Sequence, residues 1–159
     1  EKERSNNIAF RIDGESVRIH EKQSVYDSLI EKYSAWENEK PDVIVIEGQG
    51  SLMNPAYPGG FEILAAGRPD IVVLQHAPAR KDYDGFPGYP IHPLPKQIEA
   101  VELISGKKVV AVTVNHENIS DDKITEACSA IEKEVNLPAY DVLKTGGAEL
   151  AKTILKYKK

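Results

Sequence analysis

The chain has 159 residues, 41% of them hydrophobic, a formal net charge of -5 at pH 7 and a single cysteine. A chain of this size can bury a core without disulfides or a structural metal, and one cysteine excludes an internal disulfide framework. The acidic balance argues against nucleic-acid or anionic-membrane binding, and no apolar run is long enough to span a bilayer. We therefore expect a cytoplasmic protein that binds a small molecule, with homo-oligomers left open.

The first forty residues predict a hairpin and a helix. The segments IAFRI and SVRIH alternate apolar and polar residues around Asp13-Gly14, a dipeptide suited to a tight turn. From Ser24, a good N-cap, apolar residues recur at helical spacing, and Pro41 follows the end of this pattern. The chain starts in a charged stretch without an initiator Met, and we expect it to be part of a longer protein.

Three later segments are continuous apolar runs: DVIVIEG, DIVVLQH and KVVAVTVN. Strands that are apolar on both faces belong to parallel sheets covered by helices on each side. Helical patterns at 61–67, 95–105 and 121–135 alternate with these runs, and a short strand near Tyr140 precedes a closing helix at 146–157. The predicted class is α/β with a mostly parallel, doubly wound sheet. Residues 1–40 and the core at 41–159 are expected to form one domain.

The segment at 77–95 contains five prolines and three aromatic residues where a compact fold would use a short connection. Loops of this length are usually functional or disordered. Because disordered segments contain few aromatic residues, the composition favours an ordered binding loop.

Polar groups follow three of the predicted strands: Glu47, His76 and the pair Asn115-His116. In open parallel sheets, ligands bind outside the carboxyl ends of the strands. Glu47 is suited to hold Mg²⁺ near nucleotide phosphates, or to accept N–H groups from the turn that follows it. Asn115 is suited to read a nucleotide base, or to cap the strand with a turn. His116 remains unassigned.

The segment after Glu47 is uncharged and rich in glycine. Gly48 and Gly50 would let the backbone approach a ligand, although glycines also serve turns alone. Neutral hydrogen-bonding groups lie between and after them, at Gln49, Ser51 and Asn54.

His76 is a candidate general base, since imidazole titrates near neutrality, although a histidine at a strand end is also commonly structural. Arg80 and Lys81 form a cationic pair that would bind a carboxylate or phosphate, unless Asp82 and Asp84 simply balance it in solvent. The candidates for substrate binding are Gln49, Gly50, Ser51, Asn54, Arg80, Tyr89 and His92.

The motifs VIVIEGQGSLMNPAY, VVLQHAPARKDYDGFPGYPIHPLP and VVAVTVNHENIS, in this order, resemble the carboxyl-terminal domain of a family catalogued as a domain of unknown function. Some members of that family are assigned as D-glutamate, or more broadly D-amino-acid, N-acetyltransferases. The resemblance runs from about Pro41 to the end of the chain.

The resemblance implies a P-loop NTPase-like domain, similar in outline to dethiobiotin synthetase and preceded by a smaller Rossmann-like domain. The family's phosphate loop lies upstream of EGQGSL, whereas this sequence contains no G-x-x-x-x-G-K-[ST]. Carried over by position, the residues that would line the shared cleft are Glu47, Gln49, Gly50, Ser51, Asn54, Pro55, His76, Pro78, Arg80, Tyr89 and Pro90.

The leading hypothesis is therefore a transferase domain that moves an acetyl group from acetyl-CoA to the amine of an acidic D-amino acid. His76 or Glu47 would be catalytic, and Gly48 and Asn115 would contact the cofactor. The alternatives are a ligase or kinase that uses Mg-ATP, in which Glu47 binds the metal, and a non-catalytic domain that binds a nucleotide or another ligand.

Overall fold

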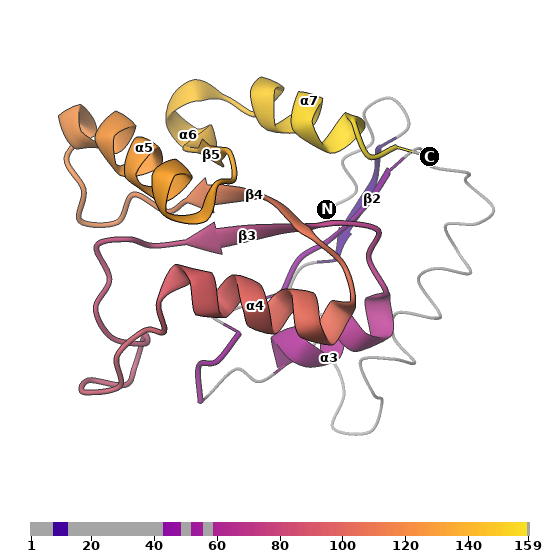
Figure 1. Cartoon of the computed structure of the whole chain (residues 1–159), viewed down its shortest axis with the longest axis horizontal. Coiled ribbons are helices and arrows are strands. Elements are labelled where there is room, and N and C mark those ends of the chain that lie inside the picture. Colours follow the sequence, from indigo (N-terminus) through magenta and orange to yellow (C-terminus); the bar gives the residue numbers. More distant parts are fainter. Residues whose placement is uncertain (1–7, 13–42, 49–51, 56–58, 159) are drawn as a thin grey trace. The chain divides into compact units, whose positions relative to one another are not determined.

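The computed structural model describes residues 8–12, 43–48, 52–55 and 59–158 (Figure 1). The chain divides into two compact units, Glu1–Arg68 and Pro69–Lys159, which we call unit 1 and unit 2 and describe separately. The second strand of the expected hairpin and the helix expected from Ser24 lie outside the described residues.

Unit 1 contains two parallel strands, β1 (Ile8–Ile12) and β2 (Val43–Ile46), and one described helix, α3 (Gly59–Gly67). The strand expected at IAFRI is confirmed, and the partner that the structure shows for it is β2. Ile44 and Val45, which point to opposite faces of β2, are 37% and 46% exposed. The expectation that this apolar run is covered on both faces is therefore wrong for β2, because an apolar pattern alone does not show what packs against it.

Unit 2 contains three parallel strands in the order β3-β4-β5, namely β3 (Val72–His76), β4 (Val109–Val114) and β5 (Ala139–Tyr140). α4 (Leu94–Ser105) connects β3 to β4. The 3-10 turn η1 (Asp121–Lys123) and α5 (Ile124–Val135) connect β4 to β5. The α/β class with parallel strands is thus confirmed, and the predicted helices at 95–105 and 121–135 are found within a few residues.

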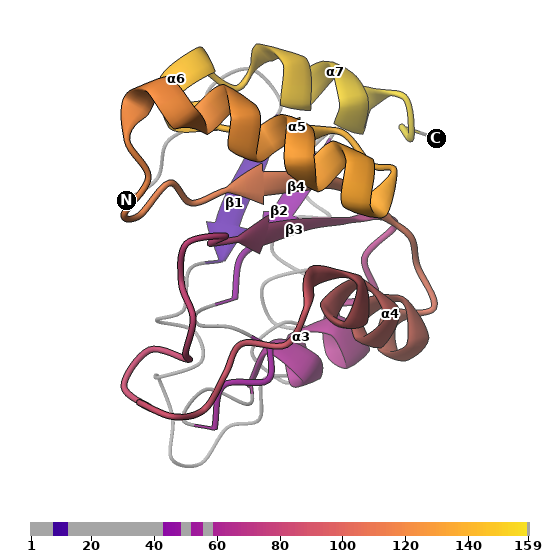
Figure 2. The ribbon, with the colours of Figure 1, turned by 60° about the vertical axis from the view of Figure 1, so that its left-hand side comes forward.

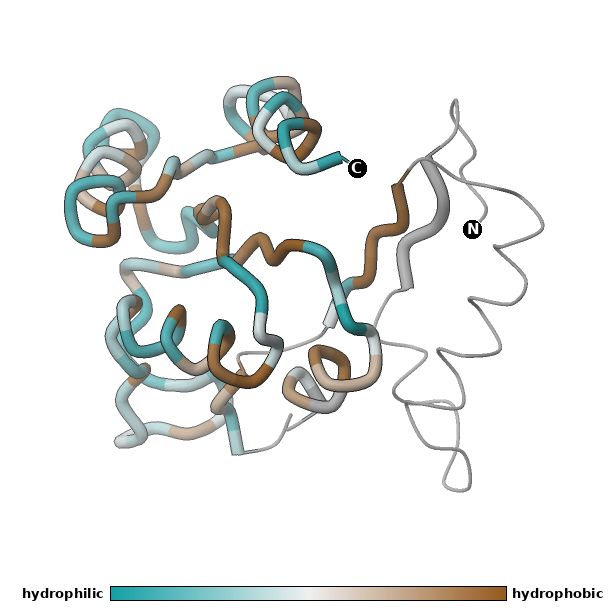
Figure 3. Tube along the Cα trace, turned by 45° about the vertical axis from the view of Figure 1, so that its right-hand side comes forward, coloured by the Kyte–Doolittle hydropathy of each residue, from teal (hydrophilic) through white to brown (hydrophobic). Residues whose placement is uncertain are grey.

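β4 is the centre of the unit 2 core. Four consecutive residues, Val109 to Val112, are at most 3% exposed, so both faces of this strand are covered. Val101 of α4 is fully buried, and α4 and α7 (Ala148–Leu155) lie on opposite sides of β4 (Figures 1 and 2). The helices of unit 2 carry both apolar and polar residues (Figure 3). Burial against β4 therefore selects one face of each helix.

The closing helix expected at 146–157 is α7, and a separate short helix, α6 (Val142–Thr145), precedes it where the sequence predicted none. Gly146 separates them with a φ of 77°, a conformation that side-chain-bearing residues rarely adopt. None of the helices in the described part of the chain has the length and apolar character required to cross a bilayer.

The proline-rich segment at 77–95 forms a small hairpin in unit 2. Asp82 pairs with Pro90 in an antiparallel bridge, and the Tyr83 amide donates to the Tyr89 carbonyl at 2.9 Å. The Tyr83 side chain is only 4% exposed and anchors the loop. The ordered conformation that the aromatic content predicts is present, and ligand binding by this loop stays a prediction.

Candidate functional site

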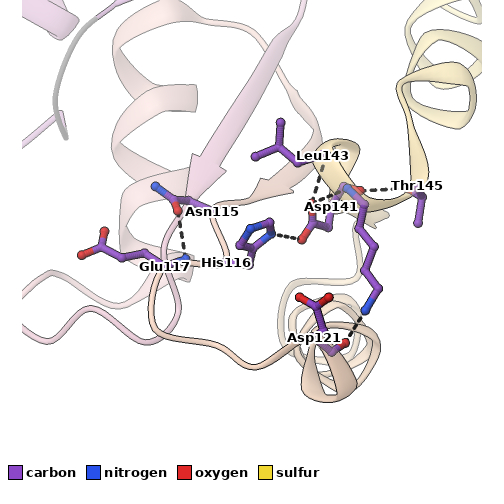
Figure 4. A network of polar contacts seen from close by, with 8 residues as sticks. Asn115, His116, Glu117, Asp121, Asp141, Leu143 and Thr145 are labelled. Carbon is purple, nitrogen blue, oxygen red and sulfur yellow. Dashed lines mark hydrogen bonds and ion pairs between the residues drawn. The ribbon is translucent and has the colours of Figure 1, made fainter.

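A polar group stands at the carboxyl end of each of the three strands of unit 2, and Figure 4 shows those that follow β4 and β5. His76 ends β3, the turn Asn115 to Glu117 follows β4, and Asp141 follows β5. The Asn115 amide donates to the His76 carbonyl at 2.8 Å, which joins the first two strand ends. The sequence placed His76 and Asn115 at one edge of the sheet, and the structure brings their backbones together there.

Asp141 is the most deeply buried charged group of this edge, with a side chain 1% exposed. Its Oδ1 accepts hydrogen bonds from the amides of Leu143 and Lys144, both at 3.1 Å, so that it caps the N-terminus of α6. Its Oδ2 pairs with Nδ1 of His116 (Figure 4). Burial alone would raise the pKa of Asp141, but the hydrogen bonds from His116 and Lys144 outweigh burial and lower it. The carboxylate is therefore ionised at neutral pH.

Arg80 forms an ion pair with Glu117 of the turn after β4. The side chains are 29% and 43% exposed, so both are accessible to a ligand in solvent. The sequence offered Asp82 and Asp84 as the groups that would balance Arg80, but Asp82 instead accepts the Gly88 amide at 3.0 Å. Arg80 therefore points to the sheet edge and its charge is already engaged by a carboxylate.

His76 is half-buried at the end of β3. Burial lowers the pKa of His76, and the charge of Glu134 offsets part of this effect. The imidazole is consequently neutral at neutral pH, which is the form that accepts a proton.

The remaining candidates of unit 2 are Asn115, His92 and Tyr89. Asn115 Oδ1 accepts a hydrogen bond from the Glu117 backbone amide at 3.0 Å. This is the turn-forming role that we gave as the alternative to recognition of a nucleotide base. His92 Nδ1 lies 2.7 Å from the Tyr83 hydroxyl, within the loop. Tyr89 is 58% exposed and packs edge-on against Phe86. The contacts of His92 and Tyr89 stabilise the loop and do not join it to the strand-end groups.

Unit 1 contains the described candidates Glu47, Gly48 and Asn54. A Cβ atom added to Gly48 would lie 3.2 Å from Cδ1 of Ile63 in α3, so close packing explains the glycine without a ligand. Asn54 is 3% exposed, whereas Glu47 is exposed beyond the end of β2. Gln49, Gly50 and Ser51 lie outside the described residues.

No group of three or more His, Cys, Asp or Glu side chains within the described ranges is arranged to hold a metal ion. Mg²⁺ is commonly held by one or two carboxylates together with phosphates and water. Binding of Mg²⁺ by Glu47, in company with a nucleotide, stays a prediction.

Sequence reasoning missed Asp141, and it left His116 and Glu117 without roles. Asp141 stood inside the segment AYDVL, which we interpreted as a strand. β5 instead ends at Tyr140, and Asp141 begins a new helix. An acidic residue just before a short apolar segment is an N-cap signal, and it could have identified this position.

Parallel strands with helical crossovers and polar groups at their carboxyl ends define the class of this protein, an α/β domain with a parallel sheet. The profile of one family, described as "Domain of unknown function (DUF1611_C) P-loop domain", matches residues 23–151. The chain belongs to this family, DUF1611.

Two curated relatives named D-glutamate N-acetyltransferase are similar to the chain. The protein from Tritonibacter scottomollicae is 26% identical over 125 residues, which cover 75% of this chain and 38% of the relative. The protein from Pseudoalteromonas sp. is 29% identical over 160 aligned positions, which cover 91% of this chain and 48% of the relative. The chain thus spans less than half the length of either relative.

A solved structure supports the fold. The crystal structure of a DUF1611 family protein from Anabaena variabilis ATCC 29413 matches 83% of this chain and 40% of its own chain with a TM-score of 0.76. Its sequence identity is 24%, so this likeness supports the fold alone.

Proposed function

We propose that this domain takes part in the transfer of an acetyl group from acetyl-CoA to the amine of an acidic D-amino acid, with D-glutamate as the first candidate. The names of the two curated relatives suggest the reaction. The observation that carries the proposal is that His76 ends β3 while the accessible guanidinium of Arg80, four residues later, pairs with the turn after β4, so both groups belong to the carboxyl edge of one sheet.

The chemistry needs a proton acceptor, because an amino acid at neutral pH is an ammonium ion that cannot attack a thioester. In this proposal His76 removes the ammonium proton, and the free amine then attacks the acetyl carbonyl carbon. Glu47 is the other candidate for this step. Because burial keeps His76 neutral, it accepts the proton without first losing one to solvent.

Arg80 is proposed to hold a carboxylate of the substrate. Guanidinium binds carboxylates through a planar pair of donors, and the ion pair with Glu117 shows that Arg80 can be reached by one here. A substrate carboxylate would compete with Glu117 or bind beside it. Of the other proposed substrate contacts, Asn54, Tyr89 and His92 are described, and Gln49, Gly50 and Ser51 lie outside the described residues.

The second candidate function is a ligase or kinase that uses Mg-ATP, which the family's description as a P-loop domain favours. Glu47 would serve the metal and Asn115 the base. Asn115 Oδ1 already accepts the Glu117 amide, so its amide nitrogen is the group that would donate to a base.

One assay separates the two functions. Purified protein is incubated with acetyl-CoA and D-glutamate, and released CoA is followed with a thiol reagent, with parallel reactions that contain L-glutamate or no amino acid. The proposal expects CoA release that depends on D-glutamate. ADP release from Mg-ATP that depends on a carboxylate substrate would support the ligase or kinase instead. An absence of both products would leave a ligand-binding domain and contradict acetyl transfer.

A further inference from the structure

We propose that His116, oriented by Asp141, is a second proton-transfer group at the carboxyl edge of the sheet in unit 2, and that its Nε2 atom is the reactive one. This inference deepens the proposed function and rests on it. It draws on a contact between the turn after β4 and the residue after β5, two segments that the strand order places side by side (Figure 4).

The hydrogen-bonding pattern fixes where the proton of this pair resides. Asp141 is ionised, and its carboxylate can only accept hydrogen bonds. Oδ1 is occupied by the Leu143 and Lys144 amides, which leaves Oδ2 to accept from Nδ1 of His116. Nδ1 must therefore carry a hydrogen, and in the neutral imidazole Nε2 is left with its lone pair.

The burial of the two side chains suits this role. Asp141 is 1% exposed and held by the first turn of α6, whereas His116 is 34% exposed. A buried carboxylate that orients an imidazole whose far nitrogen faces accessible space is the arrangement used for general acid–base catalysis on several unrelated folds. A purely structural cap for α6 would not need the histidine, since the two amides already satisfy that role.

The other titratable side chains around the pair are less suited to proton transfer. Burial raises the pKa of the Cys128 thiol, and the charge of Asp141 raises it as well, so this residue of α5 stays protonated and is a poor nucleophile. Lys144 donates to the Asp121 carbonyl, and Glu117 pairs with Arg80. His116 is therefore the group of this cluster that is suited to exchange a proton with a ligand.

The step that His116 would catalyse follows from the balance of the reaction. Once the neutral amine has attacked the acetyl carbon, the new N–C bond leaves the nitrogen positively charged with one proton to lose. Nε2 of His116 takes that proton. The C–S bond then breaks, the thiolate of CoA departs, and the protonated imidazole returns the proton to sulfur. The products are the N-acetyl amino acid and CoA, His116 ends neutral, and the proton that His76 took at the start is released to solvent.

The test compares three variants of the full chain. His116→Gln removes the proton acceptor but keeps a polar side chain. Asp141→Asn keeps the oxygen that caps α6 but lets the amide donate to Nδ1, which would move the imidazole hydrogen to Nε2. Thr145→Val is the matched control, because it removes a 2.9 Å hydrogen bond to the Asp141 carbonyl without touching the imidazole.

The first readout is the turnover of D-glutamate and acetyl-CoA. His116→Gln should lower kcat by about 10²- to 10⁴-fold, the range for loss of a general acid–base group. Asp141→Asn should also lower kcat and change the pH profile, whereas Thr145→Val should retain the kcat of the unmodified protein. If His116→Gln retains full kcat, the proposal is overturned while the acetyltransferase function stands.

The second readout does not depend on acetyl transfer. Nitrogen NMR of the histidine rings, with the His116 signal identified by its loss in His116→Gln, should show the tautomer with hydrogen on Nδ1. Hydrolysis of p-nitrophenyl acetate should be faster for the unmodified protein than for His116→Gln. If no acidic amino acid is acetylated, the proposed function fails but these two results still support the proton-transfer role. An Nε2–H tautomer, or equal rates of ester hydrolysis, would overturn it.

Discussion

Replacing Glu117 by Gln should lower KM for an acidic amino acid, because it releases the guanidinium that we propose for the substrate carboxylate. Arg80 and Glu117 form an ion pair across the sheet edge, between the loop after β3 and the turn after β4. A substrate carboxylate must displace Glu117 or share Arg80 with it. The variant removes this competing charge but keeps a side chain of the same length.

The exposure of the pair sets the size of the effect. The side chains are 29% and 43% exposed, and ion pairs this open to solvent contribute about 0.2–1 kcal/mol. If all of this free energy is returned to substrate binding, KM falls by about 1.4- to 5-fold. The kcat value should not change, because the gain is the same for bound substrate and transition state.

The assay measures initial rates of CoA release at several D-glutamate concentrations and at low salt, where charge interactions are least screened. Glu99→Gln is the matched control, since it removes the same charge from a different ion pair, that of Lys96 on α4. The control should leave KM unchanged. A KM for Glu117→Gln that equals or exceeds that of the unmodified protein would refute the role of Arg80 in carboxylate binding.

Three further experiments test other parts of the structure. His76→Gln should lower kcat by about a hundredfold or more. Because burial depresses the pKa of His76, the acidic limb of kcat/KM in the unmodified protein should lie below pH 6.5. For the same reason, the free energy of unfolding should fall as pH drops below this value. Chemical denaturation of His76→Gln should no longer show this dependence. Val112→Ala, at a site with no exposure in β4, should lower the free energy of unfolding by about 2–3 kcal/mol, whereas Leu103→Ala, 82% exposed on α4, should cost far less. Gly48→Ala should destabilise the protein by about 1 kcal/mol through its contact with Ile63, and Ile63→Val, which removes the contacting methyl group, should restore the Tm.

Local pattern was sufficient to predict β3, β4 and the longer helices of unit 2. β3 and β4 are nearly continuous runs of apolar residues, and such runs have few alternatives to a buried parallel strand. The polar residue at the end of each run is visible in the sequence, so His76 and Asn115 could be placed at one edge before any coordinates. The same reasoning overestimated the burial of β2, because that depends on tertiary packing.

The partners of these groups could not be predicted in the same way. Arg80 and Glu117 are 37 residues apart, and His116 and Asp141 are 25 apart. Nearby acidic residues in the loop offered Arg80 a simpler partner, and only the fold shows that the turn after β4 provides it. The role of Asp141 could not be predicted because it lies between a two-residue strand and a four-residue helix. Both elements are too short for a strand or helix periodicity to be recognised in the sequence.

The turn after β4 positions two side chains of the candidate site. Asn115 Oδ1 accepts the Glu117 amide, and the Asn115 amide is bonded to the end of β3, so the backbone of the turn is held at two points. The two residues that follow Asn115 then have different partners: His116 pairs with Asp141 (Figure 4), and Glu117 pairs with Arg80. One short turn therefore positions both the proposed proton-transfer group, His116, and the carboxylate that pairs with the proposed substrate-binding cation.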